Sequence, residues 1–118
     1  TEYYTKLIEC AKELRLWDLV KQTSQDALVT TTSRGMFYYN LAISHRMTGD
    51  MEQAISVIET ALKAPELTRI QLANVRFTYA RFLLEVQKPS EAASVLTELV
   101  SEVPEFVKAQ ELLSKLIN

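Results

Sequence analysis

The chain has 118 residues, of which 47% are hydrophobic, and its formal net charge is −2. This length suits a single domain covering residues 1–118, because a second independently stable core would need roughly another 100 residues. With only 2 glycines and 3 prolines, the chain has few places for sharp turns, so long elements are expected.

Composition also excludes several classes of function. The lysines and arginines are scattered, so they form no phosphate-binding stripe and no nucleic-acid partner is expected. No segment approaches the ~20 apolar residues of a membrane span, so no membrane insertion is expected. Because Cys10 is the one cysteine and His45 the one histidine, an internal disulfide, a metal site and a metal cofactor are not expected. Localisation stays open, with the cytoplasm favoured.

Helical spacing of apolar residues predicts two helices in the first 30 residues. The first covers about residues 2–15, where Tyr4, Leu7 and Ala11 fall on one stripe. The second begins near Leu16 in a different phase. It ends before residues 30–33, a β-branched and hydroxyl run that competes with helix.

Two further helices are predicted between Ser33 and Pro65. Ser33 is expected to cap the third helix through its hydroxyl, and Gly49 to end it. Asp50 is expected to cap the fourth helix. That helix should run to about Ala64, because the residue before a proline is disfavoured in the α region.

The remainder is expected to form three more helices. Residues 66–86 contain no proline or glycine and predict one long fifth helix. Pro89 and Pro104 are expected at the first positions of the sixth and seventh helices, where proline loses no hydrogen bond. No segment alternates with period two, so the predicted fold is all-α, with about seven antiparallel helices.

The predicted helices repeat in pairs. Tyr4 and Tyr38 match at a shift of 34 residues (38 − 4), whereas Ala54 and Ala92 match at a shift of 38 (92 − 54). The four extra residues are close to one helical turn, so they can lengthen the fifth helix at its start without rotating its buried stripe.

This pattern resembles the tetratricopeptide repeat (TPR) family. The central copy carries the resemblance best, through Tyr38, Leu41, Ala42, His45, Gly49, Ala54, Ile58 and Ala61, with Pro65 one residue early. In the third copy, Arg76 and Tyr79 stand at the aromatic and leucine positions, and the first copy is the loosest. The resemblance implies a superhelical array of helix-turn-helix repeats at about 1–34, 35–68 and 69–104, with a capping helix at 105–117.

In that family the first helix of each repeat lines a groove that binds partners. In the first repeat this face is an ordinary solvated surface that includes Glu9 and Lys12. In the other two repeats it carries surplus apolar residues beside arginines, which is typical of a contact surface. The predicted partner-binding residues are Met36, Tyr39, Asn40, Ile43, Arg46, Met47, Asn74, Phe77 and Arg81. The alternative is that these side chains pack between repeats or under other parts of a longer protein.

Some family members clamp the carboxylate tail of heat-shock chaperones, and this chain is not expected to do so. The clamp positions correspond to Thr5, Glu9, Asn40, Asn74 and Thr78, and only Asn40 matches the family. Glu9 would repel a carboxylate.

No enzyme is predicted. Cys10 and His45 fall in different helices with no orienting partner, so Cys10 is interpreted as a buried small hydrophobe and His45 as a satisfied core residue. Trp17 is expected to anchor its helix pair, and Gly35 is interpreted as an isolated turn glycine. We therefore expect a protein–protein interaction scaffold that binds a peptide or partner helix in the groove. The alternative is a structural or self-association module of a larger protein, which leaves homo-oligomers open.

Overall fold

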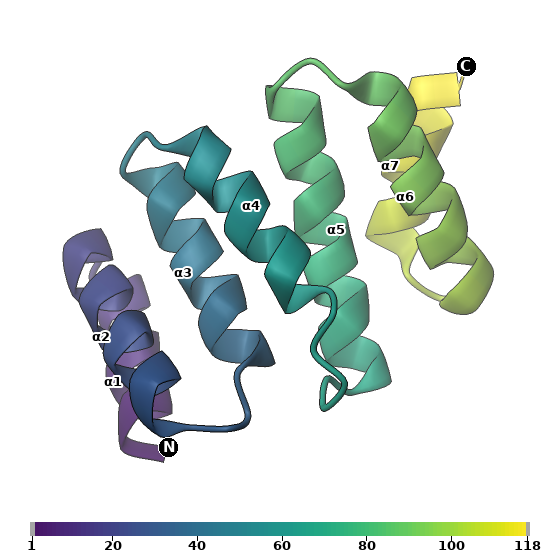
Figure 1. Ribbon diagram of the computed structural model, residues 1–118. Helices are drawn as coiled ribbons and strands as arrows, with labels where there is room; N and C mark the ends of the chain where they lie inside the picture. The colour runs from purple at the N-terminus through teal and green to yellow at the C-terminus, as the bar shows by residue number, and fades with distance from the viewer. Residues whose placement is uncertain (1, 118) are drawn as a thin grey trace. The chain divides into compact units, whose positions relative to one another are not determined.

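The computed structural model describes residues 2–117 and is all-helical over that range, as predicted (Figure 1). The chain forms two compact units, the first ending at Leu67 and the second beginning at Thr68. The single-domain expectation stays a prediction. The helices are α1 (Glu2–Glu13), α2 (Trp17–Thr30), α3 (Gly35–Met47), α4 (Met51–Ala61), α5 (Arg69–Glu85), α6 (Pro89–Glu102) and α7 (Val107–Ile117). Among the described residues, no helix has the length and apolar character needed to cross a membrane.

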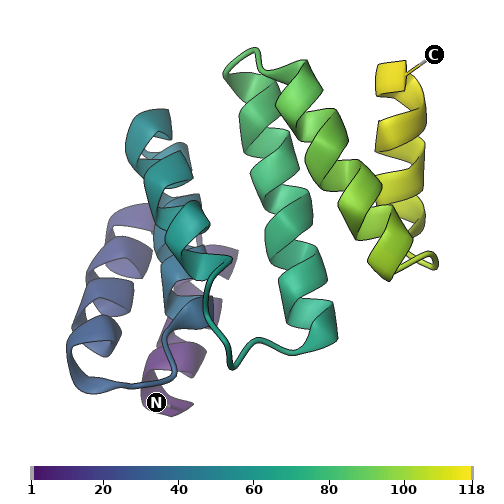
Figure 2. The same cartoon turned by 45° about the vertical axis from the view of Figure 1, so that its right-hand side comes forward.

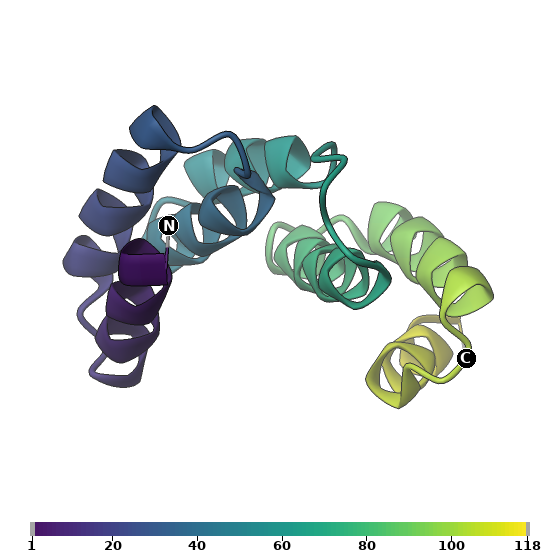
Figure 3. The same cartoon turned by 90° about the horizontal axis from the view of Figure 1, so that it is seen from below.

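The first unit consists of two helical hairpins, α1–α2 and α3–α4, with α2 packed on α3. Figure 3 shows α1 and α2 side by side. Ile8, Val20, Ala27 and Phe37 lie in one buried cluster that joins the first three helices. Trp17 packs against this cluster, which confirms its expected role as an anchor.

The second unit consists of α5, α6 and α7, with α6 packed against both of its neighbours (Figure 2). Its buried cluster includes Ala80 and Leu83 of α5 and Leu96 of α6, together with Ala109 of α7. The partly buried leucines of α7 close this cluster, because their helix would otherwise expose its apolar stripe.

The three hairpins share one turn geometry. Arg15, Gly49 and Gln87 adopt φ values of 57°, 91° and 64°. In each turn, the N–H of the following residue donates a hydrogen bond to the carbonyl five residues before it. The N–H of Asp50, for example, donates to the carbonyl of His45 at 2.8 Å. This left-handed turn caps the first helix of the pair. The turns lie 34 and then 38 residues apart (49 − 15 and 87 − 49), so the repeat holds in the backbone itself.

Burial follows the same repeat. Val20, Ala54 and Ala92 are each fully buried at 0% exposure, at matching places in α2, α4 and α6. α5 has 17 residues against 13 in α3. Since Ala80 in α5 corresponds to Ala42 in α3 at a shift of 38 (80 − 42), the extra turn precedes the shared stripe, as expected from the sequence.

Several predicted boundaries are wrong. α4 ends at Ala61, three residues early, because residues 62–64 form tighter turns, in which the N–H of Ala64 donates to the carbonyl of Ala61 at 3.1 Å. α7 begins at Val107, so Pro104 lies in the preceding turn, where its carbonyl accepts a hydrogen bond from the Gln110 amide.

The fifth helix starts later than expected, at Arg69. The Thr68 hydroxyl accepts from the N–H of Gln71 at 3.1 Å, and the Gln71 side chain accepts from the N–H of Thr68 at 3.0 Å. This capping box fixes the start of α5.

Candidate functional site

The six predicted site residues of the first unit all lie on one face of α3. Met36, Asn40, Ile43 and Met47 follow the spacing i, i+4, i+7, i+11, with Tyr39 and Arg46 beside them. All six are half-buried. The remaining faces of α3 pack on α2 and α4. They carry its buried residues, which are Gly35, Phe37, Leu41, Ala42 and Ser44. We call the six residues the α3 face.

A close approach of chain segments fixes the start of α3. Ser33 does not cap the helix as predicted; the N–H of Gly35 instead donates to the Glu66 carboxylate at 2.6 Å. A Cβ on Gly35 would lie 2.6 Å from Leu67 Cδ2 and 2.8 Å from Ala64 Cβ. Gly35 is therefore a close-packing glycine rather than an isolated turn glycine. Its contacts set where the α3 face begins.

Lys12 of α1 reaches the α3 face, although the sequence placed it on an ordinary solvated surface. Its Nζ donates to Asn40 Oδ1 at 3.0 Å and lies 6.0 Å from the centre of the Tyr39 ring. Burial lowers the pKa of the Lys12 ammonium below its ordinary value, and the nearby Glu9 carboxylate opposes this shift. The cation is thus held beside an amide and an aromatic ring.

The polar groups of the α3 face are oriented by local bonds. Asn40 Nδ2 donates to the carbonyl of Met36 at 3.0 Å, which turns Asn40 Oδ1 toward Lys12. Arg46 Nη1 lies 3.0 Å from the sulfur of Met47. The face therefore combines fixed polar groups with adaptable apolar side chains, which suits recognition of a peptide segment.

The three predicted site residues on α5 lie in the second unit. Asn74 and Arg81 are exposed. The Phe77 ring packs on Phe106, with centroids 5.2 Å apart, and against the buried cluster of that unit. The structure brings the six α3 residues together, with Lys12 as a seventh group, whereas Phe77 is largely engaged in its own core.

Two further single-residue interpretations need correction. Cys10 is exposed rather than buried, because Ile8 and Ala11 take the inward positions of α1. His45 is half-buried, but its Nδ1 is buried without a hydrogen-bond partner among the described residues. Burial lowers the pKa of His45, Lys21 lowers it further, and Asp50 opposes both.

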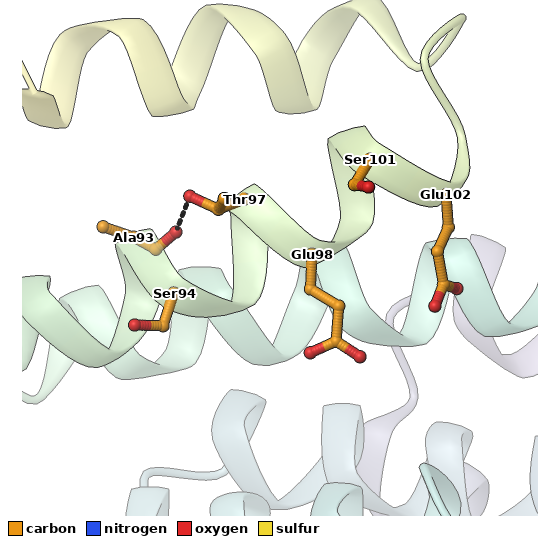
Figure 4. Close-up of a pocket in the computed structure, with 6 residues that line it drawn as sticks. All are labelled: Ala93, Ser94, Thr97, Glu98, Ser101 and Glu102. Carbon is orange, nitrogen blue, oxygen red and sulfur yellow. Dashed lines mark hydrogen bonds between the residues drawn. The ribbon is translucent and has the colours of Figure 1, made fainter.

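A surface pocket lies along α6 (Figure 4). Its lining includes the side chains of Ser94, Glu98 and Glu102. Arg76 of α5 pairs with Glu98 at 3.3 Å and also with Glu102, so these carboxylates are engaged in ion pairs. The Thr97 hydroxyl donates to the carbonyl of Ala93 at 2.8 Å. The described residues contain no group of three His, Cys, Asp or Glu side chains placed to hold a metal ion.

Comparison of the chain with models of known protein families found no match, and comparison with curated protein sequences found none either.

Proposed function

We propose that this chain is a protein-binding scaffold of the tetratricopeptide repeat kind, without enzymatic activity, that holds a peptide or partner helix against the α3 face. The repeated hairpin supports the repeat assignment, since the same left-handed turn recurs at Arg15, Gly49 and Gln87. The observation that carries the binding role is the α3 face, where four apolar side chains stay half-buried although α3 packs on both neighbours.

The chemistry of this face favours a partner that carries an apolar side chain next to a hydrogen-bond acceptor or a negative charge. Met36 and Met47 can adapt their shape to an apolar side chain, and Ile43 adds a stiffer apolar contact. Lys12, beside Asn40, and Arg46, beside Met47, supply positive charge. Recognition would thus follow the groove mode, in which a preformed surface receives a short segment.

This face is still not expected to bind the carboxylate tail of a heat-shock chaperone. Asn40, the one matching position, accepts a hydrogen bond from Lys12 through its oxygen and donates one to the carbonyl of Met36 through its nitrogen. Glu9 stands at a second clamp position, where its charge would repel a carboxylate tail. Asn74, Phe77 and Arg81 stay predicted partner contacts, but the proposal does not depend on them.

A displayed random-peptide library selected on the full chain tests this function. Replacing Ile43 with Ser should weaken binding of the selected peptides by about tenfold, which is about 1.4 kcal/mol. Circular dichroism should show unchanged helicity. Val29 is 82% exposed on α2 and outside the α3 face, so Val29→Ser is the matched control and should bind normally. Peptides that bind Ile43→Ser as tightly as the wild-type chain would contradict the proposal.

A further inference from the structure

Lys12 brings a positive charge to the α3 face without a counter-ion of its own. Its Nζ donates to Asn40 Oδ1 at 3.0 Å and lies 6.0 Å from the centre of the Tyr39 ring. In the part of the chain that the structure describes, no carboxylate lies within ion-pair distance of this Nζ. An ammonium has three N–H donors, and Asn40 takes one of them. The charge and the other donors can therefore serve a ligand.

A partner that covered the α3 face would remove water from this ammonium. Lys12 is already half-buried, and burial lowers its pKa, so part of its hydration is lost in the free chain. If only apolar side chains packed over it, the charge would be left without an acceptor, which is costly. A carboxylate of the partner would supply both an acceptor and the opposite charge, in a charge-assisted hydrogen bond. Binding at the α3 face thus favours an acid at this one place.

We propose that Lys12, with Asn40 and Tyr39, forms a subsite for one internal aspartate or glutamate of a bound peptide segment. This inference rests on the proposed function, since it concerns the segment that the α3 face holds. Asn40 follows Met36 by four residues and precedes Ile43 by three, which is about one helical turn each way. The acid therefore enters at the middle of the apolar row. The preferred segment has an acidic residue with an apolar residue on each side.

The charges around Lys12 limit the subsite to a single acid. Among the described residues, Glu9 is the one charged side chain that shifts the pKa of Lys12, and it is exposed. Glu9 forms no ion pair with Lys12, so it weakens the attraction for an incoming carboxylate without occupying the subsite. Arg46, the other cation of the face, is engaged with Met47 and in further contacts. One internal carboxylate fits this balance, whereas the paired carboxylates of a chain end would add a charge that Lys12 alone cannot offset.

Peptides from the displayed library test the subsite by a double-mutant cycle on the full chain. Lys12→Met keeps an apolar stem of similar length, so circular dichroism should be unchanged. It should weaken a peptide that carries the acid by about tenfold or more, and the matching peptide with an amide in place of the acid much less. Lys6→Met removes the same charge from an exposed position of α1 and is the matched control, which should bind both peptides normally. Amidation of the peptide C-terminus should have no effect.

Glu9 allows a test by gain of binding. Glu9→Gln should strengthen the acidic peptide by about twofold to fivefold, which is the range of an exposed charge interaction, and leave the amide peptide unchanged. Equal gains for both peptides would show that Glu9 does not act on a carboxylate at this place, and would count against the subsite.

Ile43→Ser separates this inference from the proposed function. Selected peptides that Ile43→Ser weakens but Lys12→Met binds normally would overturn the subsite and leave the α3 face as the binding surface. Selected peptides that lack an acidic residue would have the same meaning. Peptides that are indifferent to both variants would contradict the proposed function together with the subsite.

Discussion

The starts of α3 and α5 occupy equivalent places in successive hairpins but are held differently. α5 is capped locally, by the reciprocal bonds between Thr68 and Gln71. α3 has no side-chain cap from its own sequence neighbours and depends on Glu66, 31 residues away. A local cap can be read from four residues of sequence, whereas a distant one exists only after α4 has folded back. We therefore expect the first turn of α3 to unfold when its contacts with residues 64–67 are disturbed.

We expect the largest effect from Gly35→Ala, which would disturb the packing of residues 64–67 against the start of α3. The added Cβ would meet Leu67 and Ala64 at less than 3.0 Å, so we expect the free energy of unfolding to fall by about 1–3 kcal/mol. Urea denaturation followed by circular dichroism measures this loss.

Gly49 gives a matched control for that experiment. It has φ 91° with no atom within 4 Å of an added Cβ, so its requirement is conformational. Gly49→Asn should be tolerated better than Gly49→Ala, because asparagine accepts the left-handed region. Gly35→Asn should bring no such relief, and relief there would contradict a packing role for Gly35.

Removing the two helix caps one at a time should lower stability by a smaller amount. Glu66 belongs to the first compact unit and Thr68 to the second, so each loss should be confined to its own unit. Glu66→Ala and Thr68→Ala should each cost about 1 kcal/mol, typical of a lost helix cap. Hydrogen exchange should show faster exchange of the Gly35 amide in the first variant and of the Gln71 amide in the second. Similar changes at both helix starts in either variant would mean that the caps do not act separately.

The smallest expected effect on stability is that of His45. At the equivalent position of α5, 38 residues later (83 − 45), the chain carries Leu83, which is buried. Because the folded pKa of His45 is lowered, the unfolded chain binds more protons in the range just below 6.5. Stability should therefore fall as pH drops through that range. His45→Leu, which copies the second unit, should remove this part of the slope in urea midpoints measured between pH 7 and 5.5. An unchanged slope would show that His45 does not titrate differently on folding.

The sequence predicted most of the features that depend on local or repeated chemistry. Gly49 and Asp50 mark the α3–α4 turn as expected, and Asp50 accepts from the N–H of Gln53 at 3.2 Å. The number of helices and their repeat followed from apolar spacing. The capping box at Thr68 and Gln71 was also visible in the sequence as a Thr-x-x-Gln pattern, and it would have corrected the start of α5.

Some of the features that the sequence did not predict depend on contacts between distant segments. Ser33 was a reasonable cap by composition, but the fold brings Glu66 to the same N–H group. Lys12 was assigned to solvent, although the repeat already put it on the same side as Asn40, and only the packing of helices shows that the two groups meet. Cys10 was assigned to the core because free cysteine usually favours burial, yet it falls one residue from the inward Ala11.

The most direct measurement of the central claim is an amide chemical-shift titration of the full chain with its best library-selected peptide. The account predicts shifts along residues 36–47 of α3, accompanied by a change at the Lys12 side chain. Shifts confined to the α6 pocket, residues 93–102, with α3 unaffected, would contradict it.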